Sequence, residues 1–409
     1  MSARDALPPP PRNPGLQSSW NWAGAAAIWA VILLLPALQR DWLGVAALVM
    51  VGVMYGLGLH IITGLTGMLN LGFVGCAAFG AYLGCYLLKI LAPQLEGAWA
   101  SGAWQAHAGL SHQTAVLAAF LLAMLAVIVG SSLLGLVLGY PTLKLSGDYY
   151  AIVTLAFSEI ILLAIKNLAP ITGGTASMRD IPEVHFWPDL DYRLVDIHNH
   201  YVIAAALLFT MLAVLGLQFS RFGRALGALR DNRTAAEAAG INPVYYFTLA
   251  SVISSVAGGI AGFVLAEFYF TSSLNYTSFL FMGSAMVVCY VVMGGLGSYR
   301  GAVVGSIALA SATEIMRLLV GWWNSTYDQT YFHINEGLRY LFFGLVLILA
   351  MRFMPEGVFG RLRSRSRGGG ASSPEPGSPR GPQPTPADSE DAASGLWPSA
   401  PAPARRDAP

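Results

Sequence analysis

Charged side chains are scarce in this chain. Asp, Glu, Lys and Arg make up 11% of its 409 residues, whereas hydrophobic residues make up 55%. Soluble domains carry about 25% charged residues, because water must solvate their surfaces. So few charges exclude an ordinary soluble protein, and the mean hydropathy of +0.57 agrees. The net charge of +1 indicates no charged partner, and we expect no nucleic-acid partner.

Lysine and cysteine are also rare, and each scarcity excludes a kind of site. A Walker A loop ends in Gly-Lys-Ser/Thr, because its backbone amides and its lysine hold the phosphates. None of the three lysines follows a glycine, so a nucleotide site of this kind is excluded: Lys89, Lys144 and Lys166. The three cysteines lie in apolar runs without the spacing of a zinc site, and we interpret them as buried small hydrophobic residues: Cys76, Cys85 and Cys289.

Motifs of catalysis are missing as well. The chain has neither a His-Glu-x-x-His motif nor a Gly-x-Ser-x-Gly elbow. Three histidines, His185, His198 and His200, lie in one long polar connection, where their spacing allows a metal but favours simple solvation. We therefore predict no enzyme activity, no cofactor and no metal. If the chain uses an energy source, that source must be a partner or an ion gradient.

Long apolar runs are what the chain has in abundance. A helix that spans a membrane needs about 20 predominantly apolar residues. Ten runs approach this length: 22–38, 43–62, 71–91, 114–139, 149–165, 201–219, 245–267, 279–296, 301–320 and 338–354. Two of them, 22–38 and 149–165, are short, so the sequence predicts eight to ten spans. The predicted fold class is an all-α integral membrane protein, a polytopic helical bundle.

The distribution of arginine predicts the orientation. Segment 220–244 carries four arginines, and segment 352–367 carries five. With ten spans these segments fall on one side, which the positive-inside rule makes cytoplasmic. The connection 166–200 then lies outside, and acids outnumber bases in it by five to three. We expect the N- and C-termini of this multi-pass protein on the cytoplasmic side of a bacterial inner membrane.

Composition also divides the chain into parts. We predict a cytoplasmic N-terminal segment at 1–21, a transmembrane domain at 22–360 in contact with lipid, and a disordered cytoplasmic tail at 361–409. The stretch Ser373–Pro409 is rich in Pro, Ala, Ser and Gly and has almost no apolar side chain. Such a stretch cannot bury enough surface to offset its ordering entropy.

The most polar cytoplasmic segment runs from Arg221 to Pro243. Thr234 is placed to cap a short helix, Glu237 stands three residues later as in a capping box, and Gly240 can end the helix. The sequence therefore predicts a short helix on the membrane surface. Membrane orientation alone would explain the arginines, but it does not explain the order Thr-Ala-Ala-Glu-Ala-Ala-Gly-Ile.

This segment resembles a known family motif. Glu237-Ala238-Ala239-Gly240 is similar to the EAA loop of binding-protein-dependent ABC permeases. The resemblance implies that the loop docks on a separate ATPase subunit and transmits its closure. The residues it assigns to ATPase coupling are Arg224, Arg230, Arg233, Glu237, Ala238 and Gly240.

The surrounding sequence narrows the resemblance to branched-chain amino acid permeases of the LivM type, over about residues 43–360. The matching segments are Gly-Leu-Thr-Gly-Met-Leu-Asn-Leu-Gly at Gly64–Gly72 with its continuation to Tyr82, Leu145–Glu159 followed by Thr172–Gly174, Arg221–Gly262, Val292–Gly297 and Met354–Gly357. Two departures concern specificity. Phe73 stands where the family has histidine after Ser-Leu-Gly, and Ala176-Ser177 stand where it has Asn-Gly. Branched-chain amino acids, urea and short amides therefore stay open as solutes.

Glycine-broken runs indicate where a solute could pass. Gly64–Gly72 and Gly294–Gly301 interrupt neighbouring apolar runs, as paired broken helices do at transporter sites. A charge inside a span is expensive and therefore indicates function. The candidates for the solute pathway are Gly67, Asn70, Glu159, Gly294 and Gly297. As alternatives, the glycines only permit helix packing, and Glu159 is a satisfied interior acid.

Two smaller expectations concern helix contacts. Gly258 and Gly262 form a Gly-x-x-x-Gly pair, which allows two helix backbones to approach closely. Glu314 and Arg317 share a helix face at a spacing of three residues, so they can pair with each other.

Together these features predict a permease subunit that is inactive alone. The resemblance implies ABC ATPase subunits, a second, LivH-like permease, and a periplasmic solute-binding protein that delivers a small-molecule solute, with 166–200 as its candidate receptor surface. The main alternative is a secondary transporter or channel, which needs no ATPase and would have an ion site within the membrane. A membrane enzyme would need clustered nucleophiles or metal ligands, which the sequence lacks.

Overall fold

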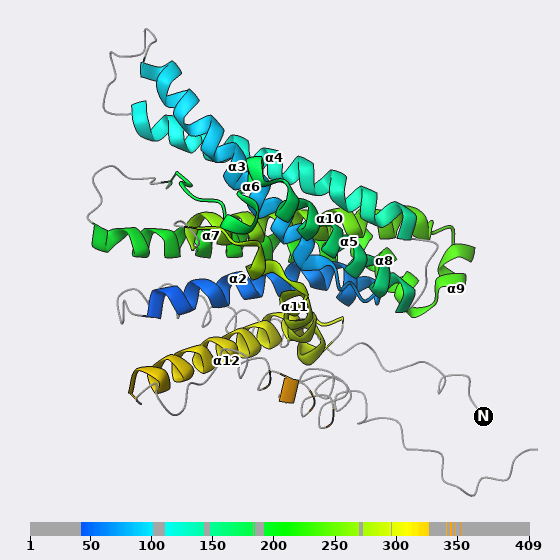
Figure 1. Cartoon of the computed structure of the whole chain (residues 1–409). Helices are drawn as coiled ribbons and strands as arrows, with labels where there is room; N and C mark the ends of the chain where they lie inside the picture. The colour runs from blue at the N-terminus through cyan, green and yellow to red at the C-terminus, as the bar shows by residue number, and fades with distance from the viewer. Residues whose placement is uncertain are drawn as a thin grey trace, which may run out of the picture. The chain divides into compact units, whose positions relative to one another are not determined.

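The structure is a computed structural model that describes residues 42–100, 111–142, 148–182, 184, 192–269, 273–295 and 297–326, with a few positions between 341 and 352. Within these residues eight helices are long and apolar enough to cross a membrane (Figure 1). They correspond to eight of the ten predicted runs, including the short run at 149–165. The predicted helical membrane fold is thereby confirmed. The run at 22–38 and the segments 1–21 and 361–409 lie outside the described residues, as does most of the run at 338–354.

The described helices follow in chain order. They are α2 (Leu43–Leu59), the π-helix η2 (His60–Gly64), α3 (Phe73–Ala100), α4 (Ser111–Thr142), α5 (Asp148–Asn167), α6 (Ala169–Thr172), the 3-10 helix η4 (Gly174–Ala176), α7 (Tyr192–Phe219), α8 (Arg221–Asp231), α9 (Arg233–Ala238), α10 (Pro243–Phe268), the 3-10 helix η5 (Tyr276–Phe279), α11 (Phe281–Gly294) and α12 (Tyr299–Thr326).

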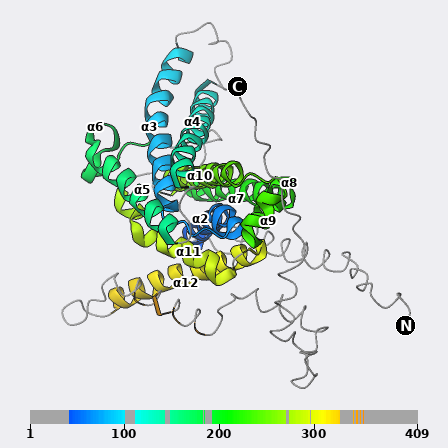
Figure 2. The same ribbon diagram turned by 90° about the vertical axis from the view of Figure 1, so that its right-hand side faces the viewer.

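Helix α10 lies at the centre of the bundle, against α2, α3 and α4 (Figure 2). Glycine makes this contact close. A Cβ atom on Gly262 would collide with the carbonyl oxygen of Ala77 in α3, and one on Gly80 would collide with the backbone of Gly259. At Gly258 the ring of Phe73 would lie 3.2 Å from such a Cβ. The close approach predicted at Gly258 and Gly262 is therefore confirmed.

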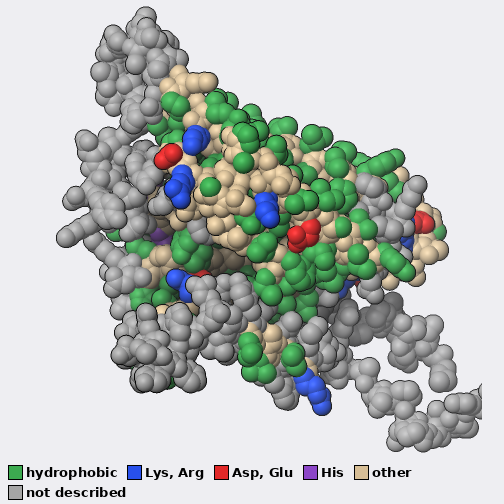
Figure 3. All heavy atoms as spheres, viewed as in Figure 1, with side chains coloured by type: hydrophobic (Ala, Val, Ile, Leu, Met, Phe, Trp, Pro, Cys, Tyr) green, Lys and Arg blue, Asp and Glu red, His purple; other side chains and the backbone are tan. Residues whose placement is uncertain are grey.

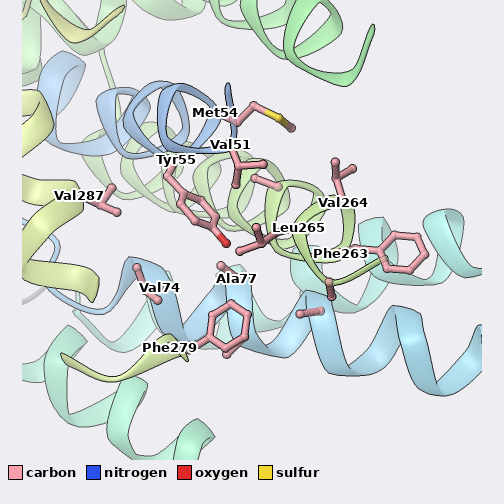
Figure 4. Close-up of a cluster of buried hydrophobic side chains, with 14 of the residues drawn as sticks. Val51, Met54, Tyr55, Val74, Ala77, Phe263, Val264, Leu265, Phe279 and Val287 are labelled. Carbon is pink, nitrogen blue, oxygen red and sulfur yellow. The ribbon is translucent and has the colours of Figure 1, made fainter. Parts of the chain in front are cut away.

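Apolar side chains fill the space between α2, α3, α10 and α11. The ring of Tyr55 projects from α2 toward α3 and α10, and the ring of Phe279 lies next to Ala77 of α3 (Figure 4). Tyr55 and Phe73 meet edge to face, with ring centroids 6.1 Å apart. Since lipid is as apolar as these side chains, dispersion contacts rather than water exclusion hold such helices together.

Many hydrophobic side chains also lie on the surface of the bundle that Figure 3 shows. Helix α4 exposes an apolar row that includes Leu121, Leu125, Val129 and Leu133. This is the surface that lipid chains solvate best. On α12 the predicted pair is present, with Arg317 Nε 2.7 Å from Glu314 Oε2.

The 168–191 connection and the loop of α8 and α9 lie at opposite ends of the bundle. Helix α7 begins where the 168–191 connection ends and finishes where α8 begins, so it crosses from one to the other. Figure 1 shows α8 and α9 at the end of the bundle where α7 finishes. The described part of the 168–191 connection is tied down by backbone hydrogen bonds between Met178 and Leu274.

Candidate functional site

The predicted surface helix is present as two short helices, α8 and α9. Ser220 caps α8, because its hydroxyl accepts a hydrogen bond from the Gly223 amide at 3.3 Å. The cap of α9 is Asn232, whose Oδ1 accepts from the Ala235 amide at 3.0 Å. The predicted cap at Thr234 is therefore wrong. Asn232 has the extended backbone of an N-cap residue, which brings Thr234 inside the first turn.

Gly240 ends α9, as the sequence predicts. Its φ of +85° lies in the left-handed region, where glycine has no Cβ to strain. The Gly240 amide donates to the Glu237 carbonyl at 2.9 Å, and the Ile241 amide donates to the Ala236 carbonyl at 3.0 Å. This pair of bonds closes the helix in a Schellman arrangement. The capping box is absent, because Glu237 Oε1 accepts from Arg233 Nε at 3.0 Å instead.

The inner faces of α8 and α9 fix them to the bundle. Leu226, Leu229 and Ala236 are buried in a cluster with Leu65 and Phe247. The residues assigned to coupling are all exposed, and all but Arg230 lie on the outer face: Arg224, Arg230, Arg233, Glu237, Ala238 and Gly240. The loop is thus a rigid, anchored element with a polar outer surface.

Arg230 is the exception among these residues. It is exposed as a whole, but its Nη1 donates to the Gly64 carbonyl at 2.6 Å. A Cβ on Gly67 would lie 3.3 Å from Arg230 Cγ, and one on Gly297 would collide with the guanidinium. The side chain therefore lies over both glycine-broken segments and joins them to α8. The sequence contains no signal for this contact.

The first broken segment begins with the π-helix η2. A π turn holds one residue more than an α turn and is frequent at functional sites. The chain then turns at Gly67, where φ is +78°. Asn70 is buried, and its Oδ1 accepts from the Gly72 amide at 2.8 Å at the start of α3. Its oxygen thus stabilises this turn.

The second broken segment separates α11 from α12. Gly295 and Gly297 have φ values of +103° and +84°. Gly294 and Gly301 face each other so closely that a Cβ on either would collide with the carbonyl oxygen of the other. Gly294 therefore serves the packing of α11 on α12, which agrees with the packing alternative for this residue.

Two buried polar side chains lie in the first broken segment. His60 and Thr63 are 0% and 2% exposed. The Thr63 hydroxyl has no hydrogen-bond partner among the described residues, whereas the His60 ring interacts with the Gln218 side chain. The Arg230 charge acts on the His60 ring. The buried Thr63 hydroxyl therefore lacks a hydrogen bond whose absence costs about 1–3 kcal/mol.

Residues 42–351 match the family described as the permease component of the branched-chain amino acid transport system. The chain belongs to this family. The high-affinity branched-chain amino acid transport permease LivM of Escherichia coli is 30% identical over 341 residues, 78% of this chain and 70% of that protein. LivH of E. coli is 32% identical over 163 residues, 39% of this chain and 47% of that protein. No solved structure matches the chain.

A more distant relative comes from an archaeon. A probable branched-chain amino acid permease LivM of Methanocaldococcus jannaschii is 28% identical over 247 residues, 56% of this chain and 66% of that protein. The matches to both LivM and LivH make this chain a LivM-type multi-pass permease component, related to both permeases of such a system.

The residues predicted for the solute pathway do not all lie together. Arg230 brings Gly67 and Gly297 together at one end of the bundle. Glu159 is not part of this group, because it lies exposed on the outer face of α5. Within this chain Glu159 is therefore not enclosed by other helices, and its place on the solute pathway stays a prediction. Within the described residues no group of three or more His, Cys, Asp or Glu side chains could hold a metal ion.

Proposed function

We propose that this chain is the LivM-type permease subunit of an ABC importer in a bacterial inner membrane. It translocates branched-chain amino acids or a similar small polar solute, and a separate ATPase subunit drives it. The observation that carries this proposal is the loop of α8 and α9, which is capped, anchored and polar on its outer face. Through Arg230 the loop reaches the two glycine-broken segments.

The same geometry supports a partner at each end of the bundle. The ATPase subunits dock on the outer face of α8 and α9, which makes this the cytoplasmic end. Helix α7 then places the 168–191 connection on the outside, where a solute-binding protein can dock. Ala176 and Ser177 line an open pocket there with Lys89. Lys89 Nζ donates to the Arg179 carbonyl at 2.9 Å and holds this surface in place.

A charge reversal on α9 tests the docking. In the complex purified with its ATPase, we expect Glu237→Lys to insert normally but to lose several-fold in ATPase co-purification and in solute-stimulated ATP hydrolysis. The new lysine would lie four residues after Arg233, so two positive charges would repel each other where the Arg233–Glu237 ion pair now lies. Glu237→Gln is the matched control, because it removes the pair without reversing the charge. Wild-type values for Glu237→Lys would remove the loop from this role.

Reconstitution without partners tests the alternative mechanism. We expect proteoliposomes that hold this chain alone to show no uptake of labelled leucine under a proton or sodium gradient. Uptake under those conditions would identify a secondary transporter or channel. In the complete system, competition of leucine uptake by valine, urea and acetamide distinguishes the candidate solutes.

A further inference from the structure

Helix α5 presents a row of exposed side chains that differs from the other outer faces described. Tyr149, Ile152, Glu159, Ile160 and Leu163 recur at helical spacing and are all exposed. Figure 3 shows unlabelled acidic atoms on this face of the bundle, next to hydrophobic and other atoms. A charged group therefore lies within an otherwise apolar stripe.

The depth of this carboxylate decides what can cover it. Glu159 lies ten residues after Tyr149 and eight before Asn167 in a span of 19 residues. At 1.5 Å per residue it is about 12 Å from the nearer end of the span. That position is inside the hydrocarbon region, whose thickness is about 30 Å. Neither a cytoplasmic ATPase nor a periplasmic protein reaches this depth.

No group of the described chain compensates this charge. Glu159 makes no hydrogen bond or ion pair with any described residue. The nearest basic residue along α5, Lys166, is seven residues away, or about 10 Å along the axis. An acidic side chain at mid-membrane costs about 2.5–3.5 kcal/mol when lipid surrounds it. The apolar row of α4 carries no such group, so α4 fits lipid and α5 does not.

The same face also has the small residues of a helix–helix contact. Ala156 and Ala164 are exposed on either side of Glu159. Small residues at an outer position allow a second helix to approach closely, and helix interfaces in membranes are rich in them. Close approach and a polar partner are what a neighbouring membrane protein supplies.

We propose that the outer face of α5 is the contact surface for a second permease subunit of the same family, which covers Glu159 with a polar or basic side chain. This inference rests on the proposed function, since it requires a two-permease assembly. The occupant is a homologue rather than an unrelated protein, because this chain matches LivH as well as LivM over part of its length. A second copy of this chain is the competing occupant.

Cross-linking from the two contrasted faces tests the contact. Ile152→Cys and Leu163→Cys on α5 carry a thiol-linked benzophenone, and Leu125→Cys and Val129→Cys on α4 are the controls. The native cysteines Cys76, Cys85 and Cys289 are buried, so they give little background labelling. In the purified complex we expect the α5 variants, but not the α4 variants, to form a covalent adduct with the second permease on irradiation.

Every other pattern overturns the proposal. An adduct from α4 alone, an adduct of α5 with a second copy of this chain, or no adduct from α5 in an intact complex each contradicts it. If the second permease does not co-purify with the wild-type chain, the proposed function fails instead, and the two failures are thereby distinguished.

A substitution at Glu159 gives a second, independent measurement. If lipid surrounded this side chain, Glu159→Leu would remove a cost and raise the yield of the inserted chain. We expect the opposite for the assembly: Glu159→Leu inserts, yet it retains several-fold less of the second permease on co-purification, while Glu159→Gln retains most of it. Unchanged co-purification for Glu159→Leu, with higher yield of the chain, would overturn the proposal.

Discussion

At the scale of single residues, Arg230 does what no other described arginine of the loop does. Its guanidinium lies against backbone that is 166 positions earlier in the chain, at Gly64. Arg221 and Arg224 stand on the same helix, and Arg224 bonds only to the nearby Phe219 carbonyl. Arg230 therefore links α8 to the transmembrane helices, whereas its neighbours lie on the outer surface of the loop.

We expect Arg230→Gln to separate ATP hydrolysis from transport. A hydrogen bond to a charged donor contributes about 1.5–3 kcal/mol, so its loss weakens the linked conformation roughly tenfold or more. Uptake by proteoliposomes should fall by about that factor while the ATPase stays bound and active, and Arg230→Lys should recover part of it. Arg221→Gln is the control on the same helix. Parallel losses of uptake and ATPase binding would place Arg230 in docking instead.

Gly297→Ala should reproduce the Arg230→Gln defect. The added Cβ would collide with the guanidinium, and the φ of +84° is unfavourable for alanine. Because both changes break one contact, the double variant should lose little more uptake than either single variant. Additive losses would show that the two residues act separately. Loss of the assembled complex in Gly297→Ala would support a packing role alone.

At the scale of elements, α9 depends on the cap that the structure assigns to it. Asn232→Ala should fray the helix at a cost of about 1 kcal/mol and lower ATPase co-purification, because the outer face of α9 then loses its fixed geometry. Thr234→Ala is the matched control and should change neither, since Thr234 is not the cap. Faster protease cleavage within 232–240 of Asn232→Ala would report the fraying directly. The reverse ranking of the two variants would restore Thr234 as the cap.

The elements themselves could largely be predicted from the sequence. Apolar runs of about 20 residues identify spans, because backbone in lipid must satisfy its own hydrogen bonds within a helix. Gly240 and the Gly258–Gly262 pair were predictable because a glycine after a helix commonly ends it, and a Gly-x-x-x-Gly pair allows close helix packing. The Asn232 cap was missed because Asn232 and Thr234 both have capping side chains, and only the backbone distinguishes them. The contact of Arg230 with Gly64 and Gly297 joins distant segments, so local sequence patterns do not contain it.

At the scale of the whole molecule, the predicted tail is expected to be dispensable. Deletion of Ser373–Pro409 should leave uptake nearly unchanged, because a stretch with so few apolar side chains has no core to lose. Uptake per amount of membrane-inserted protein is the measurement, with the full-length chain as the reference. A several-fold loss at equal expression would show that the tail binds a partner.

The π-helix η2 gives the first described span one residue that a regular α-helix would not hold there. A π turn carries one residue more than the α-helix around it, and that residue is worth about 1.5 Å of travel and about 100° of rotation if the turn tightens to α. Arg230 holds η2 by its last carbonyl, at Gly64. The loop that carries Arg230 is thus hydrogen-bonded to the π turn of the first described span. A displacement of about 1.5 Å at Gly64 is enough to change the register of this turn without moving the whole span.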